Sequence, residues 1–296
     1  IVDWIPWVDR LTVGFGVQFQ DMMANQALTV GGSVRLPSYN PGASGADLKN
    51  ITNEAAILAA RDGAKHISQH YFEMAIEKVL IGPERKSKVM NEAEKEITAY
   101  HEVGHALVGH FLLHTDPIHK ISLVSRGSAL GYTWSLPDED HRLTKRSKFY
   151  DEIAQSLGGR VAEKLVFGEM TTGASNDLEK ATKIARDMVR VYGMSDKLGP
   201  VTLGVREEAV FLGRDFHDQK AYSESVATQI DSEVNRIIAE AEDRATAVLT
   251  DHRSLLDSMS KRLLKTETIE RTEFEELVGL TPAKSPRSRK SVASSK

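Results

Sequence analysis

Apolar residues recur every three or four positions along most of this 296-residue chain, the spacing of one face of an amphipathic helix. The pattern predicts helices at roughly 147–167, 176–192 and 222–250. The last of these carries a heptad-like stripe, which favours packing in the core or between subunits over any cofactor site. The residues of the stripe are Ile230, Val234, Ile237, Ala241, Ala245 and Val248. The chain is therefore predicted to be mainly α-helical.

Two shorter amphipathic segments predict a small helical unit at 41–82. Its first helix begins near Ser44 and Asp47, and its second carries apolar residues between 71 and 79. For the first helix, the plain interpretation of Ser44 and Asp47 is an N-cap followed by a short helix.

Short β-branched and aromatic runs predict a few strands among these helices. We expect one strand at 121–125 and a second at 129–134, with Gly127 in the turn between them. The segment 28–37 is compatible with a strand or a hairpin, but the rest of 1–40 carries no pattern that assigns it.

The pattern H-E-x-x-H occupies residues 101–105 within one predicted helix. Positions i and i+4 lie on the same helix face, so His101 and His105 can offer two imidazoles to one metal ion. Glu102 lies beside them, where it can act as general base toward a metal-polarised water. Apolar flanks at helical spacing predict that this helix is buried, and buried His and Glu side chains need partners. The alternative is an ordinary polar face of a surface helix.

The chain contains no cysteine, so disulfides and thiolate zinc ligands are excluded. His110 lies about 140° round the helix from His105 and is a poor third ligand. His114 and His119 fall in the apparent turn after the helix and are expected on the surface. Spacing does not choose among the later carboxylates, Glu163, Glu169 and Asp177.

Seven motifs resemble, in order, those of the FtsH family of membrane-anchored, ATP-dependent zinc metalloproteases of the AAA class. They lie at 44–48, 53–56, 98–106, 126–133, 158–163, 172–178 and 211–214. The resemblance covers roughly residues 41–280. It implies a mainly α fold, in which a helical AAA lid subdomain is followed by a mostly helical zinc-peptidase domain with a small β-sheet beside the active site.

The resemblance also implies a domain organisation. Residues 41–82 correspond to the AAA lid and 83–280 to the peptidase domain, while 1–40 stay unassigned. Residues 281–296, rich in Ser, Lys and Arg, are predicted to be a disordered basic tail.

The resemblance assigns Asp177 as the third ligand of one zinc ion per chain, beside His101 and His105. Without it, Asp177 is better explained as a first-turn carboxylate that complements the helix dipole, with Asn176 and Glu179 as a capping box.

Glu163 is interpreted separately from this ligand set. We expect it on a solvated helix face, or in a salt bridge to Arg160 or Lys164, although it is the next candidate if Asp177 is not the ligand.

The resemblance further implies a peptide-binding strand beside the zinc cleft, which would hold substrate as an added strand. Its residues are Ala129, Leu130, Gly131, Tyr132 and Thr133. In the family the segment that contains Gly45 and Ala46 lies near the nucleotide. The P-loop pattern is absent from this chain, so ATP and Mg²⁺ would act only through an ATPase module outside it.

The expected function is the zinc endopeptidase part of a processive, ATP-dependent membrane protease that degrades unfolded, misassembled or short-lived proteins. We expect a homo-hexamer, protein substrates, and an anchor outside this chain, since it has no apolar run long enough to span a membrane. The net charge of −4 gives no case for nucleic-acid binding. The default location is the cytoplasmic side of a bacterial inner membrane, with a mitochondrial or plastid membrane as alternative.

Three other functions fit parts of the pattern: a catalytically silent hexamer-forming scaffold, a stand-alone zinc peptidase of another family, and a nucleotide-binding adaptor. The missing P-loop argues against the adaptor. The intact H-E-x-x-H and Asp177 argue against the scaffold.

Overall fold

The computed structural model describes residues 45–84, 90–126, 129–136, 143–203 and 222–279, together with four short strands near the N-terminus. Helices dominate this part of the chain, as the periodicity predicted. The predictions for Gly127, for the motif at 211–214 and for the basic tail fall outside the described residues. None of the described helices is both long and apolar enough to cross a membrane.

The four N-terminal strands pair in two antiparallel sets. β1 (Thr12–Gly14) pairs with β4 (Ser33–Arg35), and β2 (Gln18–Gln20) pairs with β3 (Ala27–Thr29). The prediction of β structure at 28–37 is therefore confirmed, but β3 and β4 do not form a hairpin with each other.

The predicted helical unit consists of α1 (Gly45–Arg61) and α2 (Gln69–Leu80), which pack on each other. Their contact is a separate small hydrophobic core in which Ile51, Phe72 and Ile76 are almost fully buried. This core forms because each helix has one apolar face that must be removed from water.

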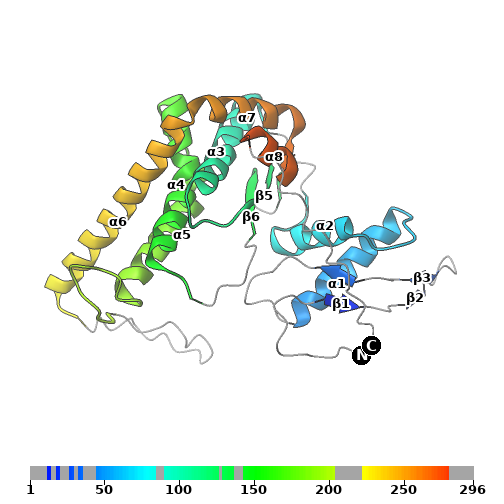
Figure 1. Cartoon of the computed structure of the whole chain (residues 1–296), viewed down its shortest axis with the longest axis horizontal. Coiled ribbons are helices and arrows are strands. Elements are labelled where there is room, and N and C mark those ends of the chain that lie inside the picture. Colours follow the sequence, from blue (N-terminus) through cyan, green and yellow to red (C-terminus); the bar gives the residue numbers. More distant parts are fainter. Residues whose placement is uncertain are drawn as a thin grey trace, which may run out of the picture.

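The larger core is built by six helices, which lie above or to the left of the α1–α2 unit in Figure 1. They are α3 (Glu92–Phe111), α4 (Arg146–Phe167), α5 (Ser175–Arg190), α6 (Glu224–Asp251), α7 (Arg253–Thr266) and α8 (Arg271–Leu277). Three of them match the helices predicted at 147–167, 176–192 and 222–250 to within two residues. The apolar stripe of α6 is buried in this core, apart from the partly buried Val248.

Helices α3 and α4 approach each other at backbone distance. A Cβ atom at Gly104 would lie 2.5 Å from the Gly158 carbonyl oxygen, and one at Gly158 would lie 2.8 Å from the Gly104 carbonyl oxygen. Since no real Cβ makes such a contact, only glycine permits this packing. The crossing brings the H-E-x-x-H segment directly against α4.

The sheet contains β5 (Ile118–Ser122), β6 (Tyr132–Ser135) and β7 (Thr268–Glu270), all antiparallel in the order β6-β5-β7. Two strands were predicted here. The predicted bounds are three residues too late at both ends of β5, and for β6 they are three residues too early at the start and one at the end. His119 lies inside β5, half-buried with its ring 4.9 Å from that of Trp134, so its predicted place in a surface turn is wrong.

One buried carboxylate joins the first helical unit to the sheet. Glu77 of α2 is 3% exposed and accepts hydrogen bonds from Lys120 Nζ at 2.8 Å, Arg126 Nη2 at 3.0 Å and the Tyr132 hydroxyl at 3.3 Å. Trp134 of β6 also packs on the small core of α1 and α2. The start of β6 is thereby attached to the first helical unit.

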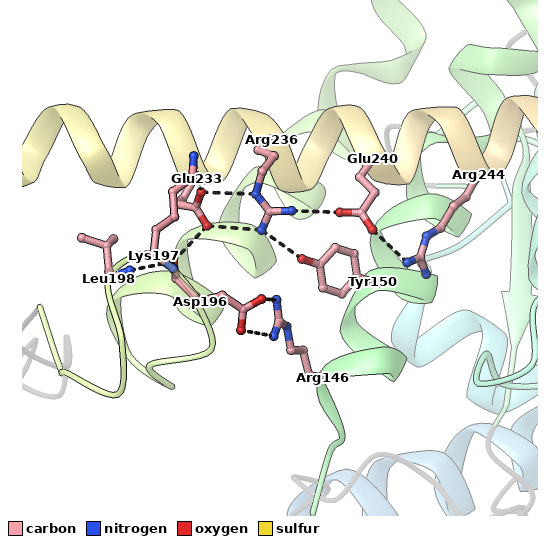
Figure 2. Close-up of polar contacts among 10 residues, drawn as sticks. Arg146, Tyr150, Asp196, Lys197, Leu198, Glu233, Arg236, Glu240 and Arg244 are labelled. Carbon is pink, nitrogen blue, oxygen red and sulfur yellow. Dashed lines mark hydrogen bonds and ion pairs between the residues drawn. The ribbon is translucent and has the colours of Figure 1, made fainter.

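A second polar network fastens the segment after α5 to α4 and α6 (Figure 2). Its centre is the fully buried Glu233 of α6, which pairs with Lys197 and Arg236 and accepts a hydrogen bond from Ser195 Oγ at 2.9 Å. At its edge, Arg146 of α4 forms two hydrogen bonds to the Asp196 carboxylate. These contacts fix the chain just beyond α5, the helix that carries Asp177.

Candidate metal centre and active site

Helix α3 carries the H-E-x-x-H segment near its middle. It starts with a capping box, in which the Asn91 side chain accepts from the Glu94 amide at 2.7 Å and the Glu94 carboxylate accepts from the Asn91 amide. The α-helical spacing then places His101 and His105 on the face toward α4. A Cβ at Gly159 of α4 would lie 2.5 Å from the His101 ring, so this glycine leaves the space that the imidazole fills.

Asp177 comes from α5, whose first turn points at the two histidines. Its Oδ2 lies 3.2 Å from His101 Nε2 and 3.3 Å from His105 Nε2, while the two Nε2 atoms are 3.0 Å apart. In a tetrahedral zinc site with bonds of about 2.0–2.1 Å, neighbouring ligand atoms are separated by about 3.3 Å. Residues from two helices therefore form a triangle of donor atoms that could hold a metal ion.

The hydrogen bonds of the two Nδ1 atoms determine whether the Nε2 atoms, which face each other, can act as metal ligands. His105 Nδ1 lies 2.8 Å from the Gln155 carbonyl oxygen, which can only accept, so this nitrogen carries a hydrogen. The longer 3.3 Å contact from the Gly159 amide to the same nitrogen does not compete with it. His101 Nδ1 lies 2.6 Å from a carboxylate oxygen of Glu163. In the neutral tautomers, both Nε2 lone pairs and a carboxylate converge on one point, an arrangement that requires a cation or a proton there.

The pKa shifts at the site agree with the need for a cation or a proton between these three atoms. Burial lowers the pKa of His101, but hydrogen bonds to Asp177 and Glu163 outweigh it and raise the pKa to about 10. Burial also opposes ionisation of Asp177, yet hydrogen bonds from His101 and His105 hold the pKa of this carboxyl well below its usual range. A metal ion bound by these three residues would therefore have to displace the proton that they share.

Glu163 is a hydrogen-bonding partner of His101, and the expectation of a solvated helix face or an Arg160 or Lys164 salt bridge is wrong. Its side chain is 1% exposed and accepts from His101 Nδ1 and from the Thr171 amide, both at 2.6 Å. These bonds outweigh the effect of burial and lower the pKa of Glu163. Local sequence does not reveal this role, because the partner lies 62 residues away on another helix.

The local structure around Asp177 also differs from the predicted capping box. A 3₁₀ turn at Thr172–Ala174 runs directly into α5, whose N-cap is Ala174 and has no side-chain cap. Asp177 does lie in the first turn of the helix, as predicted. Glu169 is exposed and does not belong to the metal-binding group.

Glu102 is 7% exposed beside the triangle, and burial raises the pKa of its carboxyl. It lines a cleft together with His101, His105 and Asp177. The five residues predicted to bind substrate line the same cleft: Ala129, Leu130, Gly131, Tyr132 and Thr133. Thr133 Oγ1 lies 2.8 Å from both the Glu102 carbonyl oxygen and Glu102 Oε2, a contact that sequence analysis did not anticipate.

Gly45 and Ala46, the residues predicted near a nucleotide, occupy the first turn of α1 and do not line this cleft.

Two imidazoles one turn apart, a carboxylate from a later helix and an adjacent buried glutamate define the class of site found in metallopeptidases. Residues 88–277 match the model of Peptidase family M41, and residues 41–74 match that of the AAA+ lid domain. The first match covers well over half of the chain, which therefore belongs to peptidase family M41.

Similar proteins carry the name that the resemblance suggested. An ATP-dependent zinc metalloprotease FtsH 1 from Conexibacter woesei is 54% identical over 243 residues, covering 82% of this chain and 37% of that protein. An ATP-dependent zinc metalloprotease FtsH from Kosmotoga olearia is 52% identical over 246 residues, covering 83% and 38%. The corresponding protein from Rubrobacter xylanophilus is 50% identical over 238 residues, covering 80% and 37%. The chain thus spans less than two-fifths of the length of these relatives.

Proposed function

We propose that this chain is the zinc endopeptidase part of a longer ATP-dependent protease, with His101, His105 and Asp177 as the zinc ligands. The observation that carries the proposal is the triangle of Nε2, Nε2 and Oδ2 atoms, 3.0–3.3 Å apart, beside the buried Glu102. Zinc held there would polarise a water molecule and the carbonyl of the scissile peptide bond.

Glu102 is the general base of this proposal. Its carboxylate takes a proton from the attacking water and afterwards delivers it to the leaving amine, so that protons balance over the reaction. Burial raises the pKa of this carboxyl, which favours uptake of the proton by Glu102. It lies next to His101 in the chain, which keeps it close to the metal.

Two further contacts orient the ligands. Glu163 accepts the Nδ1 hydrogen of His101, and the Gln155 carbonyl accepts that of His105. Each bond fixes the tautomer that presents Nε2 to the metal and sets the plane of the ring.

The substrate lies along β6 in this proposal. Among the described strands, β6 forms one edge of the sheet, with β5 as its one neighbour. An extended peptide added to that edge would run through the cleft past Glu102, held by main-chain hydrogen bonds that do not depend on side-chain identity. This binding mode suits a protease that acts on many sequences.

The wider setting is proposed from the resemblance. Residues 41–82 form a AAA lid and 83–280 the peptidase domain, and the match of 41–74 to the AAA+ lid supports the first of these. An ATPase module outside this chain would unfold substrates and feed them to a hexameric ring of peptidase domains. That assembly would be anchored in a membrane, on the cytoplasmic side in a bacterium.

The test is zinc content by elemental analysis, with hydrolysis of a quenched fluorescent peptide, on the parent chain, two test variants and one control variant. We expect about one zinc per chain with activity. Asp177→Ala should lose both, and Glu102→Gln should keep zinc and lose activity. Glu169→Gln, an exposed carboxylate outside the cleft, is the control for charge removal. Full activity of Glu102→Gln would refute the mechanism, zinc retained by Asp177→Ala would refute the ligand set, and a parent chain with neither zinc nor activity would favour the scaffold.

A further inference from the structure

One side chain of strand β6 is hydrogen-bonded to the proposed general base. Successive side chains of a strand point to opposite faces, and here Tyr132 bonds Glu77 of the first helical unit while Thr133 bonds Glu102. Among the described residues, Thr133 is the one side chain that donates a hydrogen bond to the Glu102 carboxylate.

The Thr133 hydroxyl contacts both the main chain and the side chain of Glu102. Its oxygen is 2.8 Å from the Glu102 carbonyl oxygen and 2.8 Å from Oε2. A hydroxyl has one hydrogen, which these two acceptors must share. A glutamate side chain has high rotamer freedom, and confining it to one rotamer costs conformational entropy. A fixed donor beside the carboxylate offsets that cost.

Strand β6 packs so closely on α3 that the Thr133 hydroxyl is held beside Glu102. A Cβ at Gly131 would lie 3.1 Å from Glu102 Cγ and 2.9 Å from the Ser122 carbonyl oxygen. Glycine just before β6 therefore allows the strand to pack against Glu102. Antiparallel pairing of Thr133 with Ile121 fixes the position of Thr133 along β5. The hydroxyl is placed by the sheet and not by a mobile side chain, since threonine has a single rotatable bond that is restricted by its branching.

We propose that Thr133 is a positioning residue for Glu102: its hydroxyl holds Oε2 and directs the other carboxylate oxygen toward the cleft that both residues line. The inference rests on the proposed function, in which Glu102 is the general base. It adds a side-chain role to a strand whose main chain would bind substrate.

A purely structural role predicts a different result. If the bond to the Glu102 carbonyl oxygen mattered alone, its loss would lower stability, and kcat would follow only through loss of folded, zinc-loaded protein. Positioning of the carboxylate predicts instead a fall in kcat with KM, zinc content and the urea unfolding midpoint little changed.

The experiment compares Thr133→Val, which keeps the shape and removes the hydroxyl, with Thr133→Ser, which keeps the hydroxyl, in the full chain. Loss of an outer hydrogen-bonding partner at a metal site typically lowers affinity or activity by about 10–100-fold, so we expect kcat of the Val variant to fall by about that factor. We expect Ser to restore kcat to within about threefold of the parent. The crystal structure of the zinc-loaded Val variant should show the Glu102 carboxylate in more than one rotamer. Thr115→Val, which removes the contacts of a hydroxyl with the Gly109 and Leu112 carbonyl oxygens at the end of α3 outside the cleft, is the control.

Should Val disturb folding, Thr133→Ala and Thr133→Ser give the same comparison, because these two side chains differ by the hydroxyl alone. The proposal is overturned if removal of the hydroxyl leaves kcat within twofold, if Ser fails to restore it in a normally folded protein, or if Glu102 keeps one rotamer without it. An active Glu102→Gln variant would instead overturn the proposed function. The two failures are therefore distinguishable.

Discussion

Removal of the Glu163 charge should weaken zinc binding without removing a ligand. Glu163→Gln keeps an oxygen that can accept from His101 Nδ1 but loses the charge that shortens this bond to 2.6 Å. Glu163→Ala removes the acceptor and leaves both His101 Nδ1 and the Thr171 amide without this partner. The two variants therefore disturb the same contact to different degrees: Gln weakens the hydrogen bond to His101, and Ala removes it.

The magnitude follows from the kind of bond that is lost. Loss of a partner behind a metal ligand costs about 10–100-fold in metal affinity, equivalent to about 1.4–2.7 kcal/mol. Charge-assisted bonds are roughly twice as strong as neutral ones, so the Gln variant should fall near 10-fold and the Ala variant near 100-fold. Both should still bind one zinc at saturation.

The assay is competition for zinc between the protein and a fluorescent chelator at fixed pH, followed by peptide hydrolysis at saturating zinc. Glu169→Gln serves as control, because this glutamate is exposed and outside the metal-binding group. Unchanged affinity of Glu163→Ala would refute the reasoning. Loss of zinc as complete as that of Asp177→Ala would show that Glu163 is itself a ligand.

Three further predictions concern the proton on His101, the crossing of α3 and α4 at Gly104, and the buried Glu77 that joins α2 to the sheet. The pKa of His101 is raised from 6.5 to about 10, so zinc binding at pH 7.5 should release about one proton from this residue. Calorimetry of zinc binding in two buffers with different heats of ionisation measures the release, and an absence of release would contradict this prediction. Gly104→Ala should cost about 1–3 kcal/mol in urea unfolding and Gly109→Ala less, because the Gly104 Cβ would meet backbone and the Gly109 Cβ a flexible side chain. Glu77→Ala should lower the free energy of unfolding by about 3–5 kcal/mol, and Glu54→Ala, at a more exposed ion pair, by under about 1 kcal/mol. Equal losses would show that the buried contacts of Glu77 contribute little to stability.

Local signals in the sequence determined most of the helices and half of the site. The bounds of α4, α5 and α6 follow from apolar spacing, because burial of one helix face leaves a period of 3.6 in the chain. The pairing of His101 with His105 follows from the same period. By contrast β7 and α8 are short, and so few residues carry no distinct periodicity.

Tertiary structure decided which carboxylates matter and what each of them does. Asp177 was selected by resemblance, since spacing alone left Glu163 and Glu169 open. The fold places Asp177 within 3.3 Å of both imidazoles and Glu163 behind His101. Thr133 reaches Glu102 only because β6 packs over α3. Such contacts join residues 31–76 positions apart in the chain, and they depend on the glycine-mediated crossing of α3 and α4 and on the close approach at Gly131. Distance between helices is set by packing of whole elements, and no local pattern records it.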